Sequence, residues 1–370
     1  MPRTQGPLVS AVTTGVYVVP TDRPEADGTL SWDHTTLVLV EVDAGGQRGL
    51  GWTYAASACQ AVIEENLVPL LCGADVFATA ATHESMVRAC RNFGRPGVVS
   101  CAISAVDIAL WDAKAKLLGV ALAELFGRYQ DSAPIYGSGG FTTYDEATAT
   151  AQIERWTAEL AIPRVKIKVG ESWGSNEERD LKRVIHARHV AGDDVELYVD
   201  ANGGYTTPQA IKLGGRFIDA ADVCWFEEPV SSDSLDELRL VREHLALDVA
   251  AGEYGFDERY FERMLAARSV DCVQVDVTRC GGFTSWLRVA ALAYAHGTDV
   301  SAHCAPNLHA HVATAVPNLR HVEYFWDHER IESMLFDGVL APQGGTMTPD
   351  SSTPGHGLSL KAADAAPYRR

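Results

Sequence analysis

The sequence predicts an α/β protein in which a (β/α) barrel follows a smaller α+β unit. Two observations indicate this fold. The chain has 370 residues, which is longer than one hydrophobic core usually grows, so two units are expected. After Pro134, about eight short β-rich runs recur every ~25–30 residues, each followed by an amphipathic helix, and this is the pattern of a closed (β/α) barrel.

The first unit is predicted over residues 1–130 and combines strands with helices. Thr36–Val42 has the composition of a strand, and Gly45-Gly46 predicts a turn after it. From Ser100 onward, apolar residues repeat at helical spacing until Gly119, which predicts a long helix that ends there.

The barrel is predicted over residues 131–335. Its strands are expected at Pro134–Ser138, Arg164–Val169, Val195–Asp200, Val223–Glu227, Asp248–Glu253, Cys272–Val277, Thr298–Cys304 and His321–Trp326. An open doubly wound sheet is the alternative, but no Gly-rich dinucleotide loop follows its first strand. Residues 336–370 are rich in Pro and Gly, contain one more short apolar run, and are expected to fold back against the first unit.

The composition excludes several classes of partner. A formal net charge of -18 with no Lys/Arg-rich run disfavours binding to nucleic acid and to membrane surfaces. Met1–Pro20 lacks the continuous apolar stretch of a signal peptide, and no apolar segment is long enough to cross a bilayer. The 8 cysteines form no C-x-x-C pair, so we expect reduced, buried thiols without a role, in a cytoplasmic protein.

Two lysines occur on the second predicted barrel strand. Side chains alternate along a strand, so Lys166 and Lys168 point to one side, while the apolar Val165, Ile167 and Val169 point to the other. If the apolar side faces the helices, both ammonium groups lie inside the barrel. An exposed edge strand with solvated lysines would give the same pattern.

Three carboxylates end the next three strands. Asp200, Glu227 and Glu253 would repel one another at the mouth of a barrel unless a cation joined them. Ligands that are all oxygen favour magnesium or manganese over zinc, so we predict one Mg²⁺ ion held by these residues. Asn202 and Glu228, which lie close to them in sequence, are predicted to support the site.

The last three strands supply an acid–base pair and one more carboxylate. Asp276 on the sixth strand and His303 at the end of the seventh are expected to be neighbours. A carboxylate that accepts a hydrogen bond from one imidazole nitrogen raises the basicity of the other, which makes the pair a candidate base. Glu323 lies on the eighth strand.

The ordered set K-x-K, Asp, Glu, Glu, Asp, His, Glu resembles the mandelate racemase subgroup of the enolase superfamily. The likeness covers nearly the whole chain: Ser104–Asp112 resembles a helix of that family's capping domain, and Trp225–Pro229 resembles its fourth barrel strand. The resemblance implies a (β/α)7β TIM-like barrel with an α+β N-terminal capping domain completed by the C-terminal tail. The related muconate-cycloisomerase subgroup has a lysine where this chain has Asp276.

The resemblance also implies roles for the residues. Asp200, Glu227 and Glu253 would hold magnesium, while Lys168 and the Asp276–His303 pair would be the two bases. Lys166 would assist at the substrate carboxylate, and Glu323 would donate a hydrogen bond to it. Glu323 can do so only as a protonated acid, which we expect its anionic surroundings to favour.

These groups suit removal of the proton next to a carboxylate, a weak acid whose anion needs positive and protic neighbours. If His303 returns a proton to the same carbon, the enzyme is a racemase or epimerase; if it protonates a departing β-hydroxyl, it is a dehydratase. The resemblance favours dehydration of an acid sugar. The expected substrate is a small carboxylic acid or acid sugar, and a homo-oligomer is expected.

Two other classes compete with this interpretation. His309-Ala310-His311 is an H-x-H that could belong to a zinc-dependent barrel hydrolase, but it follows the seventh strand, where a local histidine pair on a helix is expected. A non-catalytic, metal-dependent binder of sugar acids would need the three carboxylates without the bases. Lys168, Asp276 and His303 argue against that binder.

Residues that determine specificity are predicted in two loops of the first unit, near Thr21–Glu25 and Trp52–Tyr54. Arg23 could meet the distal carboxylate of a diacid, although an exposed loop arginine is the favoured explanation. Trp52 and Tyr54 would line a pocket that mixes polar and aromatic groups, as a polyol requires.

Overall fold

The computed structural model describes residues 6–370. Eight parallel strands form a ring in chain order, and β11 pairs with β4 to close it, with Val322 opposite Ile135. The strands are β4 (Ala133–Gly139), β5 (Arg164–Lys168), β6 (Glu196–Asp200), β7 (Val223–Glu227), β8 (Asp248–Ala251), β9 (Cys272–Val275), β10 (Asp299–Ala302) and β11 (Leu319–Phe325). The predicted barrel is confirmed, and each predicted run coincides with one strand apart from small differences at the ends.

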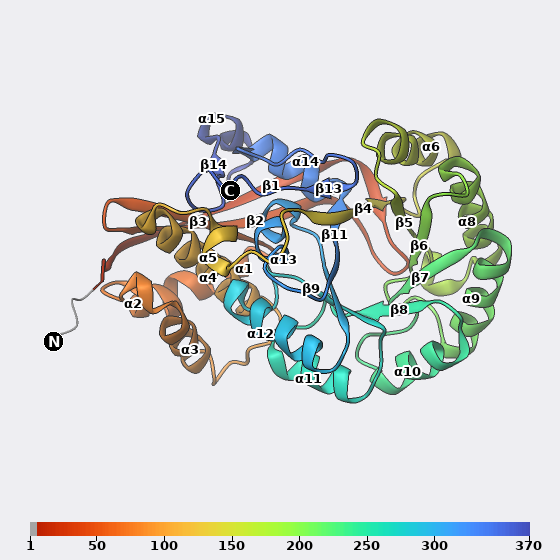
Figure 1. The fold of residues 1–370 in the computed structure, drawn as a ribbon, viewed down its shortest axis with the longest axis horizontal. Coiled ribbons are helices and arrows are strands. Elements are labelled where there is room, and N and C mark those ends of the chain that lie inside the picture. The colour runs from red at the N-terminus through yellow and green to blue at the C-terminus, as the bar shows by residue number, and fades with distance from the viewer. Residues whose placement is uncertain (1–5) are drawn as a thin grey trace.

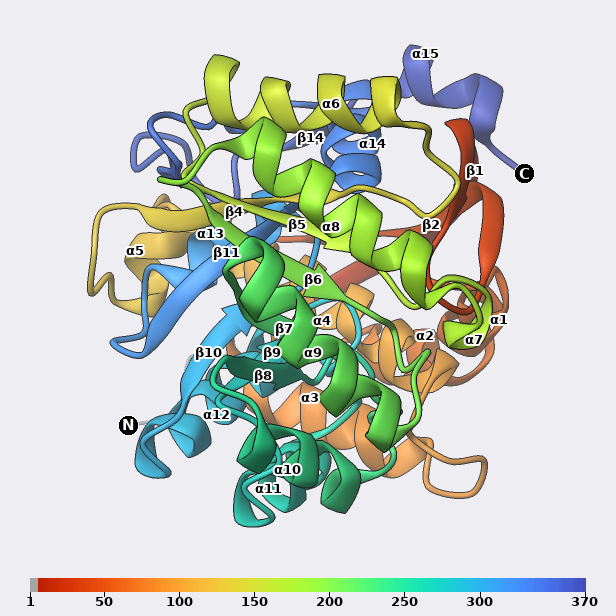
Figure 2. The ribbon, with the colours of Figure 1, turned by 90° about the vertical axis from the view of Figure 1, so that its right-hand side faces the viewer.

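Helices follow the strands and lie outside the ring, as Figure 2 shows for α8, α9 and α10. The barrel helices are α6 (Glu146–Glu154), α7 (Glu171–Gly174), α8 (Glu177–Ala191), α9 (Thr207–Ala221), α10 (Leu235–His244), α11 (Glu258–Ala266), α12 (Gly282–Ala295), α13 (Pro306–Ala313) and α14 (Trp326–Leu335). A π-helical turn, η3 (Arg155–Glu159), extends α6.

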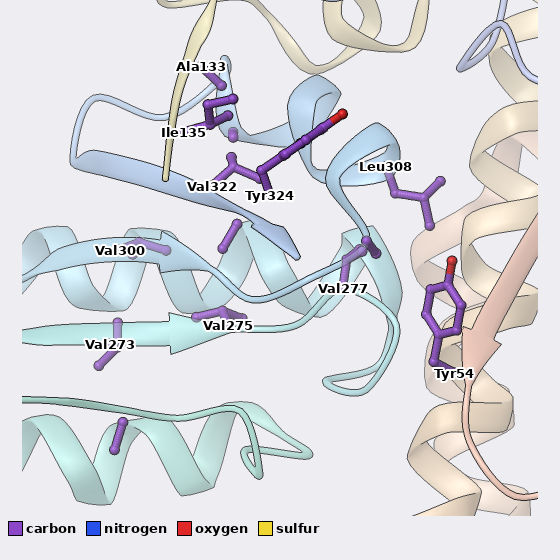
Figure 3. Close-up of a cluster of buried hydrophobic side chains, with 14 of the residues drawn as sticks. Tyr54, Ala133, Ile135, Val273, Val275, Val277, Val300, Leu308, Val322 and Tyr324 are labelled. Carbon is purple, nitrogen blue, oxygen red and sulfur yellow. The ribbon is translucent and has the colours of Figure 1, made fainter. Parts of the chain in front are cut away.

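Side chains alternate along each strand, so the outer side of the barrel is apolar, while its interior has an aromatic layer followed by a charged layer. Valines on β9 and its neighbours, among them Val273, Val275 and Val300, are fully buried in the main hydrophobic core (Figure 3). Inside the ring, the first layer is aromatic and contains Tyr136, Tyr198 and Trp225. This layer fills the amino-terminal half of the barrel, so the next inward residues, which are charged, lie at the carboxyl ends of the strands.

The cap is an antiparallel sheet, β1 (Val9–Ala26), β2 (Ser31–Ala44) and β3 (Gln47–Tyr54), covered by α4 (Val98–Leu118). Gly119, with φ 69°, ends α4 as predicted. A Cβ atom at Gly51 would lie 2.3 Å from the carbonyl oxygen of Ala105, so only glycine lets β3 approach α4 this closely. The smaller helices of the cap are α1 (Ala58–Val62), η1 (Ile63–Leu67), α2 (Val68–Leu71), η2 (Val76–Ala78), α3 (Thr79–Ala89) and α5 (Leu122–Phe126).

The segment after α14 returns to the cap, and Figure 1 shows it beside β1. It contains β12 (Phe336–Asp337), β13 (Thr346–Met347), β14 (Ser359–Leu360), α15 (Ala362–Ala365) and η4 (Ala366–Tyr368). Phe336 stacks on Trp52 of β3, with ring centroids 4.6 Å apart. The backbone N–H of His356 donates to Asp112 of α4 at 2.9 Å. The C-terminal segment therefore completes the cap.

Among the described residues, no helix is both long and apolar enough to span a membrane. The stretch Met1–Pro20, which lacks the apolar run expected of a signal peptide, lies partly outside the described residues. From Val9 onward it is part of β1.

Candidate active site

Three buried carboxylates meet where β6, β7 and β8 end. Asp200 and Glu227 are the last residues of adjacent strands and are paired in register, while Glu253 lies two residues beyond β8. One oxygen from each of the three lies within 4.8 Å of the other two. Parallel strands in register bring these side chains together, as the sequence predicts.

Neighbouring groups orient the three carboxylates. Glu227 Oε2 accepts hydrogen bonds from Gln274 Nε2 at 2.8 Å and from the indole N–H of Trp225 at 3.2 Å. Asp200 Oδ1 accepts one from the backbone N–H of Asn202 at 2.9 Å. Glu253 Oε2 accepts no hydrogen bond among the described residues and lies 3.3 Å from His303 Nε2.

The donor set fits a hard divalent cation. Burial, together with the charge of Asp200, raises the pKa of Glu227 to about 8, so the protein's own charges do not fully offset the clustered acids. Three oxygen donors without a sulfur or nitrogen donor are the ligands that magnesium and manganese prefer. Glu253 Oε2, which accepts no hydrogen bond among the described residues, is consistent with an ion at this point.

Both lysines of β5 point into the barrel, which excludes the exposed edge strand. Lys168 Nζ lies 2.5 Å from Asp200 Oδ2. Lys166 Nζ lies 2.5 Å from Glu227 Oε1 and 2.8 Å from Glu323 Oε1. Burial opposes the charged form of each lysine, but these carboxylates outweigh burial and raise the pKa of both amines.

The predicted pair of Asp276 and His303 is present. His303 Nδ1–H donates to Asp276 Oδ2 at 2.8 Å, which leaves Nε2 toward the cavity. Asp276 Oδ1 accepts from both the N–H and the hydroxyl of Thr278, each at 2.7 Å. Burial opposes the imidazolium, but Cys304, Glu253 and the other acids raise the pKa of His303 well above its ordinary value.

The charges around Glu323 oppose its expected protonation. Burial favours the neutral acid, but Lys166 and His303 outweigh it and hold the pKa of Glu323 well below its usual range. The expectation rested on the anionic neighbours of Glu323. In the structure an ammonium group, that of Lys166, also lies 2.8 Å from its carboxylate. Glu323 also accepts from Ser138 Oγ at 2.6 Å, so its position is fixed from two sides.

Asn202 and Glu228 lie beside the carboxylates. Asn202 has φ 45°, and its Oδ1 is buried without a hydrogen bond among the described residues. Glu228 is buried, and burial followed by the charges of Glu253 and Asp200 raises its pKa well above the ordinary value. Both residues are therefore available to orient groups at the mouth of the barrel.

A cavity of about 340 Å³ lies between the cap and these residues. Lys168, Asn202, Glu253, His303 and Glu323 line it from the barrel side. The cap side is formed by β2, β3 and the turn between β1 and β2, with Asp27, Trp32, His34, Thr35, Thr36 and Tyr54 among the lining residues. The lining is mainly polar with a few aromatic rings.

Of the three predicted specificity residues, only Tyr54 lines this cavity. Its ring stacks on His328 with centroids 3.5 Å apart, and its hydroxyl donates to Glu332 at 3.1 Å. Figure 3 shows Tyr54 between the cap strand and the barrel, with its hydroxyl directed toward Leu308. Tyr54 ends β3, and therefore stands where the cap faces the barrel.

The prediction that Trp52 lines the pocket is wrong, and Arg23 is exposed, which is the alternative that the sequence favoured for it. Trp52 points to the same side of β3 as Tyr54 but lies one pair further from the barrel, where Phe336 covers it and leaves it 0% exposed. Arg23 lies on β1, is exposed, and donates to Thr148 of α6 at 2.8 Å. Neither residue lines the cavity, and neither segment is a loop.

The H-x-H pair is not a metal site. His309 donates from Nδ1 to the carbonyl of Cys304 at 2.7 Å and accepts at Nε2 from the N–H of Val277 at 2.9 Å. Both of its nitrogens are therefore engaged by backbone, and burial lowers its pKa. His309 ties the loop after β9 to the loop after β10, which positions Asp276 against His303.

Two residues of the site escaped the sequence analysis. Arg279 lines the cavity, with Nη1 3.3 Å from Glu253 Oε1 and Nε 3.5 Å from Asp276 Oδ2. Cys304, which was expected to have no role, lines the cavity next to His303. A charged residue three positions after Asp276 was a usable signal for Arg279. The expectation that all cysteines are buried is also wrong for Cys72 and Cys224, which are exposed.

Comparisons with known proteins agree with this geometry. Residues 148–365 match the family described as enolase C-terminal domain-like, and residues 11–127 match the mandelate racemase / muconate lactonizing enzyme N-terminal domain. The chain is 30% identical over 337 residues to L-talarate/galactarate dehydratase of Salmonella typhimurium, covering 89% of this chain and 81% of that protein. Other curated relatives are named as sugar-acid dehydratases and as cycloisomerases.

Two solved structures have the same fold. A mandelate racemase/muconate lactonizing enzyme-like protein from Rubrobacter xylanophilus superposes with a TM-score of 0.95 at 46% identity, over 98% of this chain and 100% of the other. A racemase from Streptomyces coelicolor with bound magnesium superposes with a TM-score of 0.92 at 29% identity, over 98% and 100%. The chain therefore belongs to the mandelate racemase/muconate lactonizing enzyme family of the enolase superfamily.

Proposed function

We propose that this protein is a magnesium-dependent acid-sugar dehydratase, which converts a sugar acid to a 2-keto-3-deoxy acid. The observation that carries the proposal is the pair of basic groups at the cavity, Lys168 on β5 and the Asp276–His303 pair on β9 and β10. In the ring, β4 and β11 separate β5 from β10 on one side, and β6 to β9 separate them on the other. The two groups therefore approach a substrate from different sides.

The carboxylate of the substrate would be bound beside the three acidic residues. Asp200, Glu227 and Glu253 would hold the magnesium ion, and when bound this ion supplies positive charge for the substrate carboxylate. Lys166, buried between Glu227 and Glu323, contributes a second positive charge at this point. Glu323 accepts hydrogen bonds in its ionised form, so it would orient Lys166 and any hydroxyl nearby.

The neutral amine of Lys168 removes the proton from C2 and becomes an ammonium group, and the electron pair of that C–H bond enters the carboxylate. His303 then gives a proton to the hydroxyl on C3, the C3–O bond breaks, and water leaves. The remaining enol tautomerises to the 2-keto acid. Asp276 holds the Nδ1–H tautomer of His303, so that Nε2 is the atom that exchanges protons with the substrate.

The character of the cavity supports a sugar acid over an aryl hydroxy acid. Asp27, His34 and Thr35 from the cap and Arg279 from the barrel can hydrogen-bond to several hydroxyl groups. A pocket for an aryl group would be more uniformly apolar. Relatives named as dehydratases of talarate, galactarate and arabinonate act on substrates of this class, which is consistent with the proposal.

Racemisation of a 2-hydroxy acid is the second candidate, because two bases on different sides of one carbon also allow a proton to leave from one face and return to the other. The same site carries both reactions, and a solved neighbour is named as a racemase. The two candidates differ in their products. Dehydration yields a keto acid, whereas racemisation yields an acid of inverted configuration.

A library of acid sugars, incubated with the protein and Mg²⁺, distinguishes them. We expect a semicarbazone to form from the 2-keto product of at least one sugar acid. Polarimetry of the same reactions provides the contrast: optical inversion without a keto acid would reject dehydration and favour the racemase. Proton NMR in deuterated water tests the shared first step, since α-proton exchange is required by both reactions. Absence of exchange across the library would favour a non-catalytic binder.

A further inference from the structure

Three different metal-ligating atoms form a small triangle at the cavity, beside the three-carboxylate cluster, with His303 Nε2 3.3 Å from Glu253 Oε2. Cys304 Sγ lies 3.3 Å from His303 Nε2 and 3.4 Å from Glu323 Oε2. His303 Nε2 lies 3.6 Å from Glu323 Oε2, which closes the triangle. All three side chains are buried, and all three residues line the cavity.

These separations are those of a tetrahedral zinc site. Bond lengths of about 2.3 Å to sulfur and about 2.0–2.2 Å to nitrogen and oxygen, at tetrahedral angles, place the ligand atoms ~3.4–3.6 Å apart. The three observed separations lie within a few tenths of an ångström of that range. The triangle therefore matches one face of a tetrahedron, and a fourth ligand would be water or substrate.

The residues around the triangle hold its members in place. His303 Nδ1 donates to Asp276 at 2.8 Å, the carboxylate–histidine arrangement that orients zinc-binding imidazoles elsewhere. Glu323 is held by Ser138 at 2.6 Å and by the backbone N–H of Cys304 at 3.0 Å. The geometry is thus built into the fold and needs no rearrangement of a loop.

We propose that His303, Cys304 and Glu323 form a second metal site, selective for a soft divalent ion such as zinc. Binding displaces the thiol proton of Cys304 and, from the imidazolium form, the Nε2 proton of His303, and both protons are released to solvent. The sulfur distinguishes this site from the cluster of Asp200, Glu227 and Glu253, which offers only oxygen. Magnesium, which binds thiolates poorly, would not compete for it.

The occupied site would inhibit the enzyme. The soft ion takes Nε2 of His303, the nitrogen that the proposed function requires for proton transfer, so zinc and turnover exclude each other. This consequence rests on the proposed function, whereas the binding of the ion does not. The two parts are therefore tested separately.

Cobalt(II) is the probe for binding, because a cobalt–thiolate bond gives a charge-transfer band in the near ultraviolet. We expect magnesium-saturated protein to show this band on titration with Co²⁺, and Zn²⁺ to abolish it. Cys304→Ser should lose the band, while the matched variant Cys224→Ser, which changes an exposed thiol, should keep it. Asp200→Asn should also keep it, because that residue belongs to the other cluster.

A band that survives in Cys304→Ser would overturn the site, as would the absence of any band in the wild-type protein. Circular dichroism establishes that Cys304→Ser is folded. If it is not, X-ray absorption at the zinc edge of the wild-type protein replaces the variant: one sulfur neighbour supports the site, and only nitrogen and oxygen neighbours reject it.

The inhibitory consequence is measured as the rate with zinc divided by the rate without it, at saturating magnesium, within each variant. We expect this ratio to be one tenth or less in the wild-type protein, and close to one in Cys304→Ser. A cobalt–thiolate band without inhibition would leave the metal site in place and contradict the role of His303 in turnover. Inhibition that persists in Cys304→Ser would place the inhibitory zinc elsewhere.

Discussion

Nδ1 of His303 donates a hydrogen bond to Oδ2 of Asp276 at 2.8 Å, and the two residues follow adjacent strands, β10 and β9. Replacement of Asp276 by Asn removes the charge and allows the amide to face Nδ1 as a donor, which favours the wrong tautomer. We expect kcat to fall by roughly 10²–10⁴-fold. Steady-state kinetics with a turned-over sugar acid measure this.

The matched control for that change is Asp271→Asn. Asp271 lies at the opposite end of β9, where it pairs with Arg242 at 2.7 Å. Its loss should change stability without changing kcat by more than a few-fold. Equal kcat for the wild-type protein and Asp276→Asn would contradict the proposed role of Asp276 in the acid–base pair.

Asp200→Asn is expected to abolish both magnesium binding and activity. The substitution removes one of three oxygen ligands and the negative charge that faces Lys168 at 2.5 Å. Affinity for Mg²⁺ should fall by more than the ~10–100-fold that loss of a supporting residue costs. Calorimetric titration with Mg²⁺ measures this, and Asp194→Asn, at an exposed position before β6, serves as control. Full activity after exhaustive chelation would contradict the requirement for a metal.

His303→Asn and Lys168→Ala should separate the two halves of the reaction. We expect His303→Asn to lose turnover but to retain exchange of the α-proton, if the substrate presents its C2–H to Lys168. Lys168→Ala should lose both. Proton NMR in deuterated water follows the exchange, and the keto-acid assay follows turnover. Turnover that is unchanged in His303→Asn would exclude the imidazole from the mechanism.

Glu258 should make stability depend on pH. Burial raises its pKa, but Arg95 from the cap and hydrogen bonds from Ser285 and Arg288 outweigh burial and lower the pKa to about 2. Because the folded-state pKa lies below the ordinary value of 4.5, the stabilisation is complete above about pH 4.5 and is lost as the pH falls toward about 2.

Glu258→Gln should therefore lower the free energy of unfolding by roughly 1–3 kcal/mol at pH 7, and the difference should shrink below about pH 4.5. Thermal midpoints measured between pH 7 and pH 3 report this change. Glu262→Gln changes an exposed residue of the same helix, α11, and should leave the midpoint unaltered at every pH. A Glu258→Gln difference that is independent of pH would contradict the ion pair.

Trp52 and Tyr54 occupy the same side of β3 but should respond differently to substitution. Trp52→Ala removes a fully buried side chain and should cost about 3–5 kcal/mol of stability. Tyr54→Ala removes a wall of the cavity and should raise KM on the order of tenfold. Chemical denaturation and steady-state kinetics on both variants distinguish the two roles. A KM effect confined to Trp52→Ala would contradict their placement.

The barrel and its charged mouth were predictable because strand periodicity is local. Alternation along β5 placed Lys166 and Lys168 inside from five residues of sequence, and parallel pairing then brought Asp200 beside Glu227. Trp52 could not be placed in this way. Whether it faces a pocket or a core depends on Phe336, which lies 284 positions later in the chain and covers it.

The positions of side chains in the loops after the strands also could not be predicted from periodicity. Arg279 and Cys304 lie after β9 and β10, where no alternation constrains the direction of a side chain. Their positions depend on contacts such as those of His309 with Val277 and Cys304, which join two loops through one imidazole. The charge state of Glu323 could not be predicted for the same reason, since it depends on the distance between its carboxylate and Lys166.

Because residues 336–370 complete the cap, the order of synthesis separates the two halves of one hydrophobic core. The ribosome delivers β3 first, but Phe336 and His356, which cover Trp52 and bond to α4, follow only after the whole barrel has been translated. During this interval the apolar side of β3 remains incompletely covered, as in other nascent chains whose partners emerge late. The cap therefore cannot reach its final packing until residues 336–370 have been translated.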